Sequence, residues 1–123
     1  MTISGTLIAE SMRVGASLEN LPLRVVKISR EDAGDVTAGQ PSTWTFIAFE
    51  IPDEHADALA TALGAALEGP GGWYCDFRSA EETFVVFAER AFRYPRGNAT
   101  ARADAEAYAR SVGVPEAQLD WPE

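Results

Sequence analysis

The chain has 123 residues, of which 46% are hydrophobic and 24% charged, and its formal net charge is −9 at pH 7. This length and composition are typical of one globular domain, so residues 1–123 are expected to form a single domain with no need of a metal or disulfide. The acidic balance disfavours nucleic acid as a partner, because phosphates would be repelled. No apolar run approaches the roughly 20 residues that cross a bilayer. The N-terminal residues do not resemble a secretory signal, and one cysteine favours a reducing cytoplasm.

The first fifty residues predict three strands. Loose alternation of apolar residues predicts one long or bent strand over 2–14, and clearer alternation predicts a second over 21–29. Residues 31–42 contain two glycines and a proline, and they predict a long loop. The segment 44–50 is apolar on both sides, which indicates a strand inside a sheet.

A helix is predicted after this third strand. Pro52 suits a first helical turn, because its missing N–H has no partner there, and the two acidic residues that follow suit the positive end of the helix dipole. Apolar residues recur at helical spacing from Ala56 to Leu67 and form one stripe for burial. Gly69 and Pro70 are expected to end the helix.

The second half of the chain predicts three more strands and a second helix. The strand segments 73–78, 83–88 and 91–94 are joined by connections short enough to force antiparallel neighbours. The second helix is expected from about residue 99 to 112, with Asn98 as its N-cap.

The predicted order is three strands, a helix, three strands and a helix. This order indicates a two-layer α+β domain, in which two helices pack on one face of an antiparallel sheet of about six strands. Near the C-terminus, Leu119 and Trp121 lie two residues apart. Since a disordered tail rarely contains a tryptophan, we expect this segment to dock back on the domain as an irregular turn.

The outer face of the last three strands is the candidate interface. We take Arg78 to pair with Glu82 across the first turn, and alternate side chains then point to opposite faces. One face would receive the helices, whereas the other would mix aromatic, apolar and charged groups, as interfaces do. The candidate interface residues are Tyr74, Asp76, Arg78, Phe84 and Val86. Cover by other strands or the tail, or a register shifted by one residue, is the alternative.

A second candidate site is the turn that leads into the second helix. Four arginines and no acidic residue occur from residue 90 to 102. The free N–H groups at a helix start can hold a carboxylate or phosphate, which arginine can clamp. The candidate anion-binding residues are Arg93, Arg96, Asn98 and Arg102. In the alternative interpretation, this is a simple turn whose arginines pair with the protein's own carboxylates.

Other reactive residues lack the partners that a catalytic or metal site needs. His55, the only histidine, is expected on the polar face of the first helix, and Cys75, the only cysteine, as a small buried hydrophobe. The glycines at 69, 71 and 72 lead into a strand, so they predict a turn and not a phosphate loop. The chain carries no nucleophile-elbow, zinc-protease, Walker or calcium-loop motif. We therefore expect no catalytic residue, no metal site and no cofactor.

Several motifs in the second half form a family pattern. They are Gly72-Trp73-Tyr74, Asp76-Phe77, Phe84-Val85-Val86-Phe87, Phe92-Arg93-Tyr94, Gly113-Val114-Pro115 and Gln118-Leu119-Asp120-Trp121. Through these motifs, residues 72–121 resemble an uncharacterised family of small bacterial proteins of the actinobacterial type, which are stand-alone cytoplasmic domains. The resemblance implies no known activity, and no site residue is carried over from it.

These observations favour a small cytoplasmic protein-interaction domain over an enzyme. It would act as an adaptor, an inhibitor or an immunity-type protein, and would form a homodimer through the outer sheet face. The alternative is a small-molecule binding protein or small enzyme with a pocket for a small anionic ligand at the start of the second helix, and with Tyr74 and Asp76 as acid–base groups. A third hypothesis is an acidic mimic of nucleic acid, because five acidic residues and no Lys or Arg occur from 51 to 77.

Overall fold

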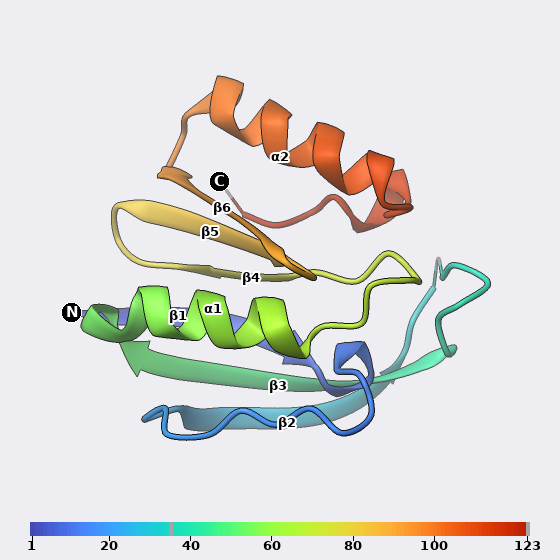
Figure 1. Ribbon diagram of the computed structural model, residues 1–123, viewed down its shortest axis with the longest axis horizontal. Coiled ribbons are helices and arrows are strands. Elements are labelled where there is room, and N and C mark those ends of the chain that lie inside the picture. The colour runs from blue at the N-terminus through green and yellow to red at the C-terminus, as the bar shows by residue number, and fades with distance from the viewer. Residues whose placement is uncertain (35, 123) are drawn as a thin grey trace.

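The computed structural model describes residues 1–34 and 36–122, which form one antiparallel sheet with two helices (Figure 1). The strands are β1 (Thr2–Ile8), β2 (Arg24–Asp32), β3 (Thr43–Pro52), β4 (Cys75–Arg78), β5 (Glu82–Phe87) and β6 (Arg90–Pro95). The helices are α1 (Ala56–Ala66) and α2 (Ala99–Ser111), and the short 3-10 helices are η1 (Ala9–Ser11), η2 (Asp53–His55) and η3 (Glu116–Gln118). The predicted α+β class and the order of strands and helices are confirmed.

The strand order in the sheet is β2-β3-β1-β4-β5-β6, and all neighbouring strands are antiparallel. β1 joins the two halves, because it pairs with β3 on one side and with β4 on the other. The last three strands form the meander that their short connections predict. The sheet therefore has two edges, β2 and β6.

β1 and β2 differ most in extent from the prediction, whereas the other strands differ by one or two residues at their ends. β1 ends at Ile8 and not near residue 14, because the chain turns into η1, where the Ser11 hydroxyl donates to the Ile8 carbonyl at 2.6 Å. β2 extends to Asp32, so Glu31 and Asp32, which we expected in a loop, belong to a strand, and residue 35 of that expected loop lies outside the described residues. An edge strand tolerates such residues because eight of the nine residues of β2 are exposed.

The two helices pack on opposite faces of the sheet, and the two sides of β5 make this clear. Phe84 and Val86 point into a core beneath α1. The alternate residues Val85 and Phe87 point into a second core with α2 and the C-terminal segment, which comprises residues 114–122. Since residues 83–87 are all buried, both faces of β5 need cover. The expectation that both helices lie on one face is therefore wrong.

The predicted outer face is also wrong, and the reason is the strand register. Arg78 pairs with Thr83 and not with Glu82. A shift of one residue exchanges the faces of β4 relative to those of β5. Phe84 and Val86, which are 3% and 0% exposed, are consequently core residues beneath α1 and cannot form an outer interface. The other three candidate interface residues, which lie on β4 or just before it, point to the α2 side of the sheet.

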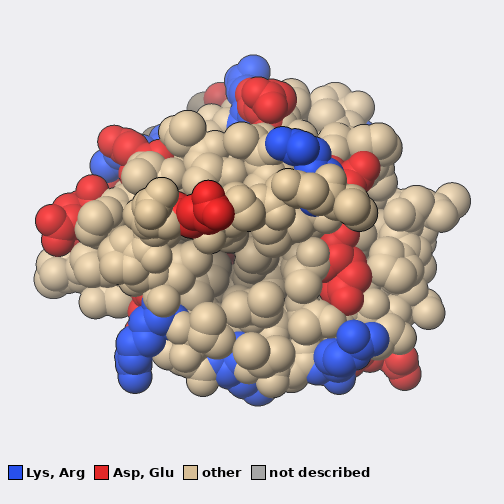
Figure 2. All heavy atoms as spheres, turned by 60° about the horizontal axis from the view of Figure 1, so that its bottom comes forward, with Lys and Arg blue, Asp and Glu red and all other residues tan. Residues whose placement is uncertain are grey.

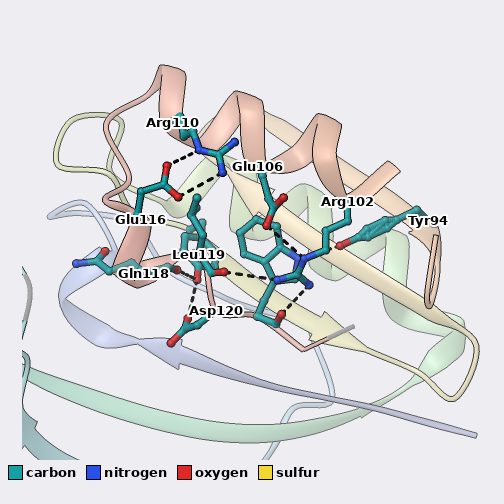
Figure 3. Close-up of polar contacts among 10 residues, drawn as sticks. Tyr94, Arg102, Glu106, Arg110, Glu116, Gln118, Leu119 and Asp120 are labelled. Atoms are coloured by element: carbon teal, nitrogen blue, oxygen red, sulfur yellow. Dashed lines mark hydrogen bonds and ion pairs between the residues drawn. The ribbon is translucent and has the colours of Figure 1, made fainter. Parts of the chain in front are cut away.

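The C-terminal segment docks on the sheet, as expected. Leu119 and Trp121 are buried in the second core. The indole N–H of Trp121 donates to the Tyr94 hydroxyl at 2.8 Å, and Arg102 of α2 donates to the Trp121 carbonyl at 2.7 Å (Figure 3). The segment is therefore held between α2 and the sheet.

On the α2 side, the described residues cover the sheet over only one of its halves. α2 and the C-terminal segment cover the half that contains β5 and β6. Within residues 1–34 and 36–122, no helix covers the half of this face that contains β1, where Ser4 and Thr6 are exposed. The boundary between the covered and the open half is the place where a concave site can form.

Candidate functional site

A hollow of about 420 Å³ lies at this boundary, between β1, β3 and the C-terminal segment. Small-molecule sites are typically clefts of roughly 300–1,000 Å³, so the hollow is large enough for a ligand. It is lined by Thr6, Ile8, Asp32, Ala33, Gly34, Trp44, Phe46, Gly72, Trp73, Tyr74, Asp76, Ala117, Gln118 and Asp120.

Aromatic rings form one wall of the hollow. Trp44 lies 5.2 Å from Trp73 and 6.1 Å from Phe46, measured between ring centroids. The Trp44 N–H donates to the Pro41 carbonyl at 2.8 Å, which fixes the orientation of its ring. This wall offers aromatic and apolar surface to a ligand.

Carboxylates converge on the same hollow from three segments of the chain. Asp76 comes from β4, Asp32 from the end of β2 and Asp120 from the C-terminal segment. Asp76 makes no side-chain hydrogen bond or ion pair with another residue in the described part of the chain. Burial raises its pKa from 3.8 to about 6, with Arg78 opposing and Asp120 adding to this shift. Asp76 is thus a poorly satisfied carboxyl group that faces a hollow.

Tyr74 connects the hollow to the C-terminal segment. Its hydroxyl donates to the Gln118 carbonyl and lies 3.3 Å from an Asp120 carboxylate oxygen. Burial, and then the charges of Asp76 and Asp120, raise the pKa of Tyr74 far above its usual value. Tyr74 therefore stays protonated and acts as a hydrogen-bond donor that positions the segment.

Gln118, which lines the hollow, pairs with the side chain of Gln40 from the loop between β2 and β3. Gln118 donates from its amide to Gln40 Oε1 at 3.0 Å, and Gln40 donates to the Gly72 carbonyl at 3.4 Å. Thr37 adds a hydrogen bond of 2.9 Å from its hydroxyl to the Gly71 carbonyl. The loop between β2 and β3 is thereby tied to the approach to β4 and to the C-terminal segment.

The predicted anion site at the start of α2 is not assembled. Arg93 forms ion pairs with Glu82 at 2.7 Å and with Asp57 of α1 at 2.9 Å, on the α1 side of the sheet. Arg96 donates to the carbonyls of Ser79 and Ala80. Arg93 is thus directed to the opposite face of the sheet from α2, and Arg96 contacts the turn between β4 and β5, so the alternative interpretation of a turn with self-paired arginines describes these two better.

The two remaining candidates stay at the start of α2 but serve the fold. Asn98 is the N-cap, as predicted, and accepts a hydrogen bond from the Ala101 N–H at 3.0 Å. Arg102 lies 3.4 Å from Glu106 and stacks over the Trp121 ring at 4.9 Å (Figure 3). A small hollow of about 190 Å³ adjoins Arg102, but Glu106 also lines it. The negative charge of Glu106 would repel an anion there.

Cys75 has the buried position that the sequence predicts, whereas His55 lies before the first residue of α1 and not on the exposed polar face of that helix. His55 is half-buried in η2. Cys75 is buried beneath α1, and burial raises the pKa of its thiol far above the usual value. In the described ranges, no group of three or more His, Cys, Asp or Glu residues could hold a metal ion.

No family model, curated protein or solved structure matches this chain. No helix in the part of the chain that the structure describes is long and apolar enough to cross a membrane.

The sequence drew attention to part of the hollow for a different reason. Tyr74 and Asp76 were expected at an outer interface or, in the alternative, as acid–base groups beside an anion pocket at the start of the second helix, whereas they line the hollow. Trp44 and Gln40 were not singled out, although a tryptophan beside a long loop is a usable signal, and Gln118 was named only as part of the motif that carries the family resemblance. Their convergence depends on pairings between distant segments, which local patterns do not contain.

Proposed function

We propose that this protein is a binding domain that holds a small organic molecule in the hollow beside its C-terminal segment. The observation that carries the proposal is a concave, partly aromatic site of about 420 Å³ that contains a carboxyl group without a partner among the described residues. Apolar walls with a few convergent polar groups are the usual features of ligand sites.

The test is a ligand screen by thermal shift, followed by NMR of the tryptophan indole N–H groups. Ligand binding stabilises the folded state by mass action, and the Trp44 and Trp73 signals report on the hollow itself. Thr6 is exposed on β1 and lines the hollow, so Thr6→Trp should fill it and abolish binding. Ser4→Trp places the same side chain on the same face of β1, outside the lining, and should leave binding unchanged. Ligands that bind the Thr6→Trp variant as well as the wild type would contradict the proposal.

A second candidate function is self-association through the free edge of β2. β2 pairs only with β3, so its other edge carries backbone N–H and C=O groups without a strand partner. Val25, Val26 and Ile28 on this strand are 52%, 49% and 64% exposed. This observation supports the protein-interaction hypothesis at a surface other than the one expected from sequence.

The charges of β2 favour a second copy of the chain as the partner. Figure 2 shows basic side chains along the lower part of the face that contains this edge, with uncharged surface between them. β2 starts at Arg24 and ends with Glu31 and Asp32. In an antiparallel pair with Ile28 opposite itself, Arg24 lies opposite Asp32 of the partner subunit. Such a pair is self-complementary, as a two-fold interface requires.

Light scattering coupled to size-exclusion chromatography at several concentrations tests this second function. The wild type should approach the mass of two chains as concentration rises, and Ile28→Lys should have the mass of one chain, because two lysines would meet at the centre. Val14→Lys is the control, since Val14 is 101% exposed but lies outside β2. A wild type with the mass of one chain throughout would contradict dimerisation and would indicate that the bulge at Val26 protects the edge.

A further inference from the structure

We infer that the ligand of the hollow is a small organic cation, with an ammonium group attached to an apolar body. This inference rests on the proposed binding function and specifies its ligand class. It follows from the charges that line the hollow, from its aromatic wall and from the position of Asp76.

The charges around the hollow select a cation. Three aspartates line it, and of the described lining residues none is Lys or Arg. Arg102 of α2 acts on Asp76 only as a neighbouring charge, because its guanidinium contacts Glu106 and the carbonyl of Trp121. The whole chain carries a net charge of −9, which attracts cations at long range. An anion would meet carboxylates from three segments and no Lys or Arg among the described lining residues, while Arg78 and Arg102 act on Asp76 from outside this lining.

The aromatic wall suits an ammonium group in particular. Trp44, Phe46, Trp73 and Tyr74 all line the hollow. The face of an aromatic ring attracts a cation through its quadrupole, and tryptophan does so most strongly. Aliphatic or aryl parts of the same ligand can pack on the remaining apolar surface. A metal ion would not use this wall, because hard cations prefer oxygen ligands.

Asp76 supplies the charge that would pair with the ammonium group. Its carboxylate has no ion-pair partner among the described residues, and an ammonium group would satisfy it. The charged and titratable groups that act on Asp76 are Arg78 on its own strand, Arg102 on α2, and Tyr74 and Asp120 on the hollow side. Because the pKa of Asp76 is about 6, the charged form that a cation needs becomes dominant between pH 5 and pH 7. Cation affinity should therefore rise with pH over this range.

Matched pairs of probes test the charge of the ligand separately from its shape. Choline is compared with its neutral isostere 3,3-dimethylbutan-1-ol, and 2-phenylethylamine with 2-phenylethanol, at fixed ionic strength and pH 7.5. The readout is the shift of the Trp44 and Trp73 indole N–H signals on titration. We expect at least one cation to bind roughly tenfold more tightly than its neutral match. Asp76→Asn should reduce this preference to about twofold or less, whereas the exposed α2 substitution Asp104→Asn removes one charge elsewhere and should leave it unchanged.

The outcomes separate this inference from the function on which it rests. Equal binding of the cation and its neutral match in the wild type would overturn the inference of a cationic ligand and leave the proposed binding function intact. Cation shifts that persist in Thr6→Trp would place binding outside the hollow and overturn both. In another outcome, the general screen yields a neutral or anionic ligand while neither cation gives a saturable shift. That result would also overturn the inference of a cationic ligand and leave the proposed binding function intact. A preference that Asp76→Asn and Asp104→Asn reduce equally would show a general charge effect and not recognition by Asp76.

Discussion

Asp76 shows how a single position acquires its chemistry from the surrounding fold. On β4 it lies between Thr6 of β1 and Val85 of β5, so the sheet fixes its backbone while its side chain faces the hollow. Burial opposes its charge more strongly than Arg78 supports it, and the pKa rises to about 6 as a result. The folded protein therefore binds this proton more tightly than the unfolded chain does.

This difference predicts how stability depends on pH. A carboxyl group whose folded-state pKa is raised contributes stability at low pH that is lost as pH rises through the range from about 4 to about 6. For a shift from 3.8 to about 6, the loss is at most about 3 kcal/mol. Asp76→Asn should remove it, so the variant should be more stable than the wild type at pH 7 and lose less stability between pH 4 and pH 7. Urea unfolding at several pH values measures both. Equal pH dependence of the two proteins would show that Asp76 is fully solvated.

Thr83 is a second residue whose environment is unfavourable. It is 1% exposed, and its hydroxyl has no hydrogen-bond partner among the described residues. A buried polar group without a partner costs roughly 1–3 kcal/mol, so Thr83→Val, which exchanges the hydroxyl for a methyl group, should stabilise the fold by about 1 kcal/mol. Thr83→Ser keeps the hydroxyl, loses a methyl group and should destabilise by about 1 kcal/mol. The free energy of unfolding in urea decides this, and a less stable Thr83→Val variant would mean that the hydroxyl is satisfied.

At the scale of elements, the C-terminal segment matters as much as a helix. Trp121 is 2% exposed, packs edge-on against Tyr74 with ring centroids 5.2 Å apart, and lies beneath the Arg102 guanidinium. Arg110 of α2 also forms an ion pair with Glu116 of η3, which fixes the turn that leads into the segment (Figure 3). A short irregular segment thereby completes the second core and forms one wall of the hollow.

Trp121→Ala should therefore weaken both the fold and the hollow. Loss of a buried tryptophan typically costs about 3–5 kcal/mol, and removal of its indole N–H also leaves the Tyr94 hydroxyl without its donor. Differential scanning calorimetry should show a large fall in the melting temperature. The exposed neighbour Pro122 provides the control, because Pro122→Ala should leave the melting temperature nearly unchanged. A similar, small fall in both variants would indicate that the segment is dispensable.

The elements themselves were predictable because their signals are local. The apolar stripe of α1, the N-cap Asn98 of α2 and the short turns of the meander all lie within a few residues of the structure that they specify. The sequence did not predict which side chains share a face of the sheet. A shift of one residue in the pairing of β4 with β5 decides this, and Arg78 pairs with Thr83 and not with its neighbour. The hollow was less predictable still, since pairing of β1 with β4 joins residues about seventy positions apart and leaves no local pattern.

At the scale of the whole molecule, β5 is shared by two cores. Phe84 and Phe87 are 3% and 1% exposed, and they lie on opposite sides of this one strand. If one core unfolded, β5 would lose its packing on that face, and the other core would then lose the strand on which it packs. The α1 core and the α2 core are therefore expected to unfold together in a single transition.

Two substitutions on β5 test this cooperativity. Phe84→Ala and Phe87→Ala should each cost about 3–5 kcal/mol, because each leaves a cavity in one core. Each variant should shift the urea transitions followed by circular dichroism and by tryptophan fluorescence to the same lower midpoint, although Trp121 lies in only one of the cores. Val25→Ala, on the exposed edge strand, is the control and should change stability by less than about 0.5 kcal/mol. If Phe87→Ala shifted the fluorescence transition alone, α2 and the C-terminal segment would be a separate unit that detaches from a folded sheet. The hollow would then be the part of the molecule that opens first, because one of its walls would belong to that unit.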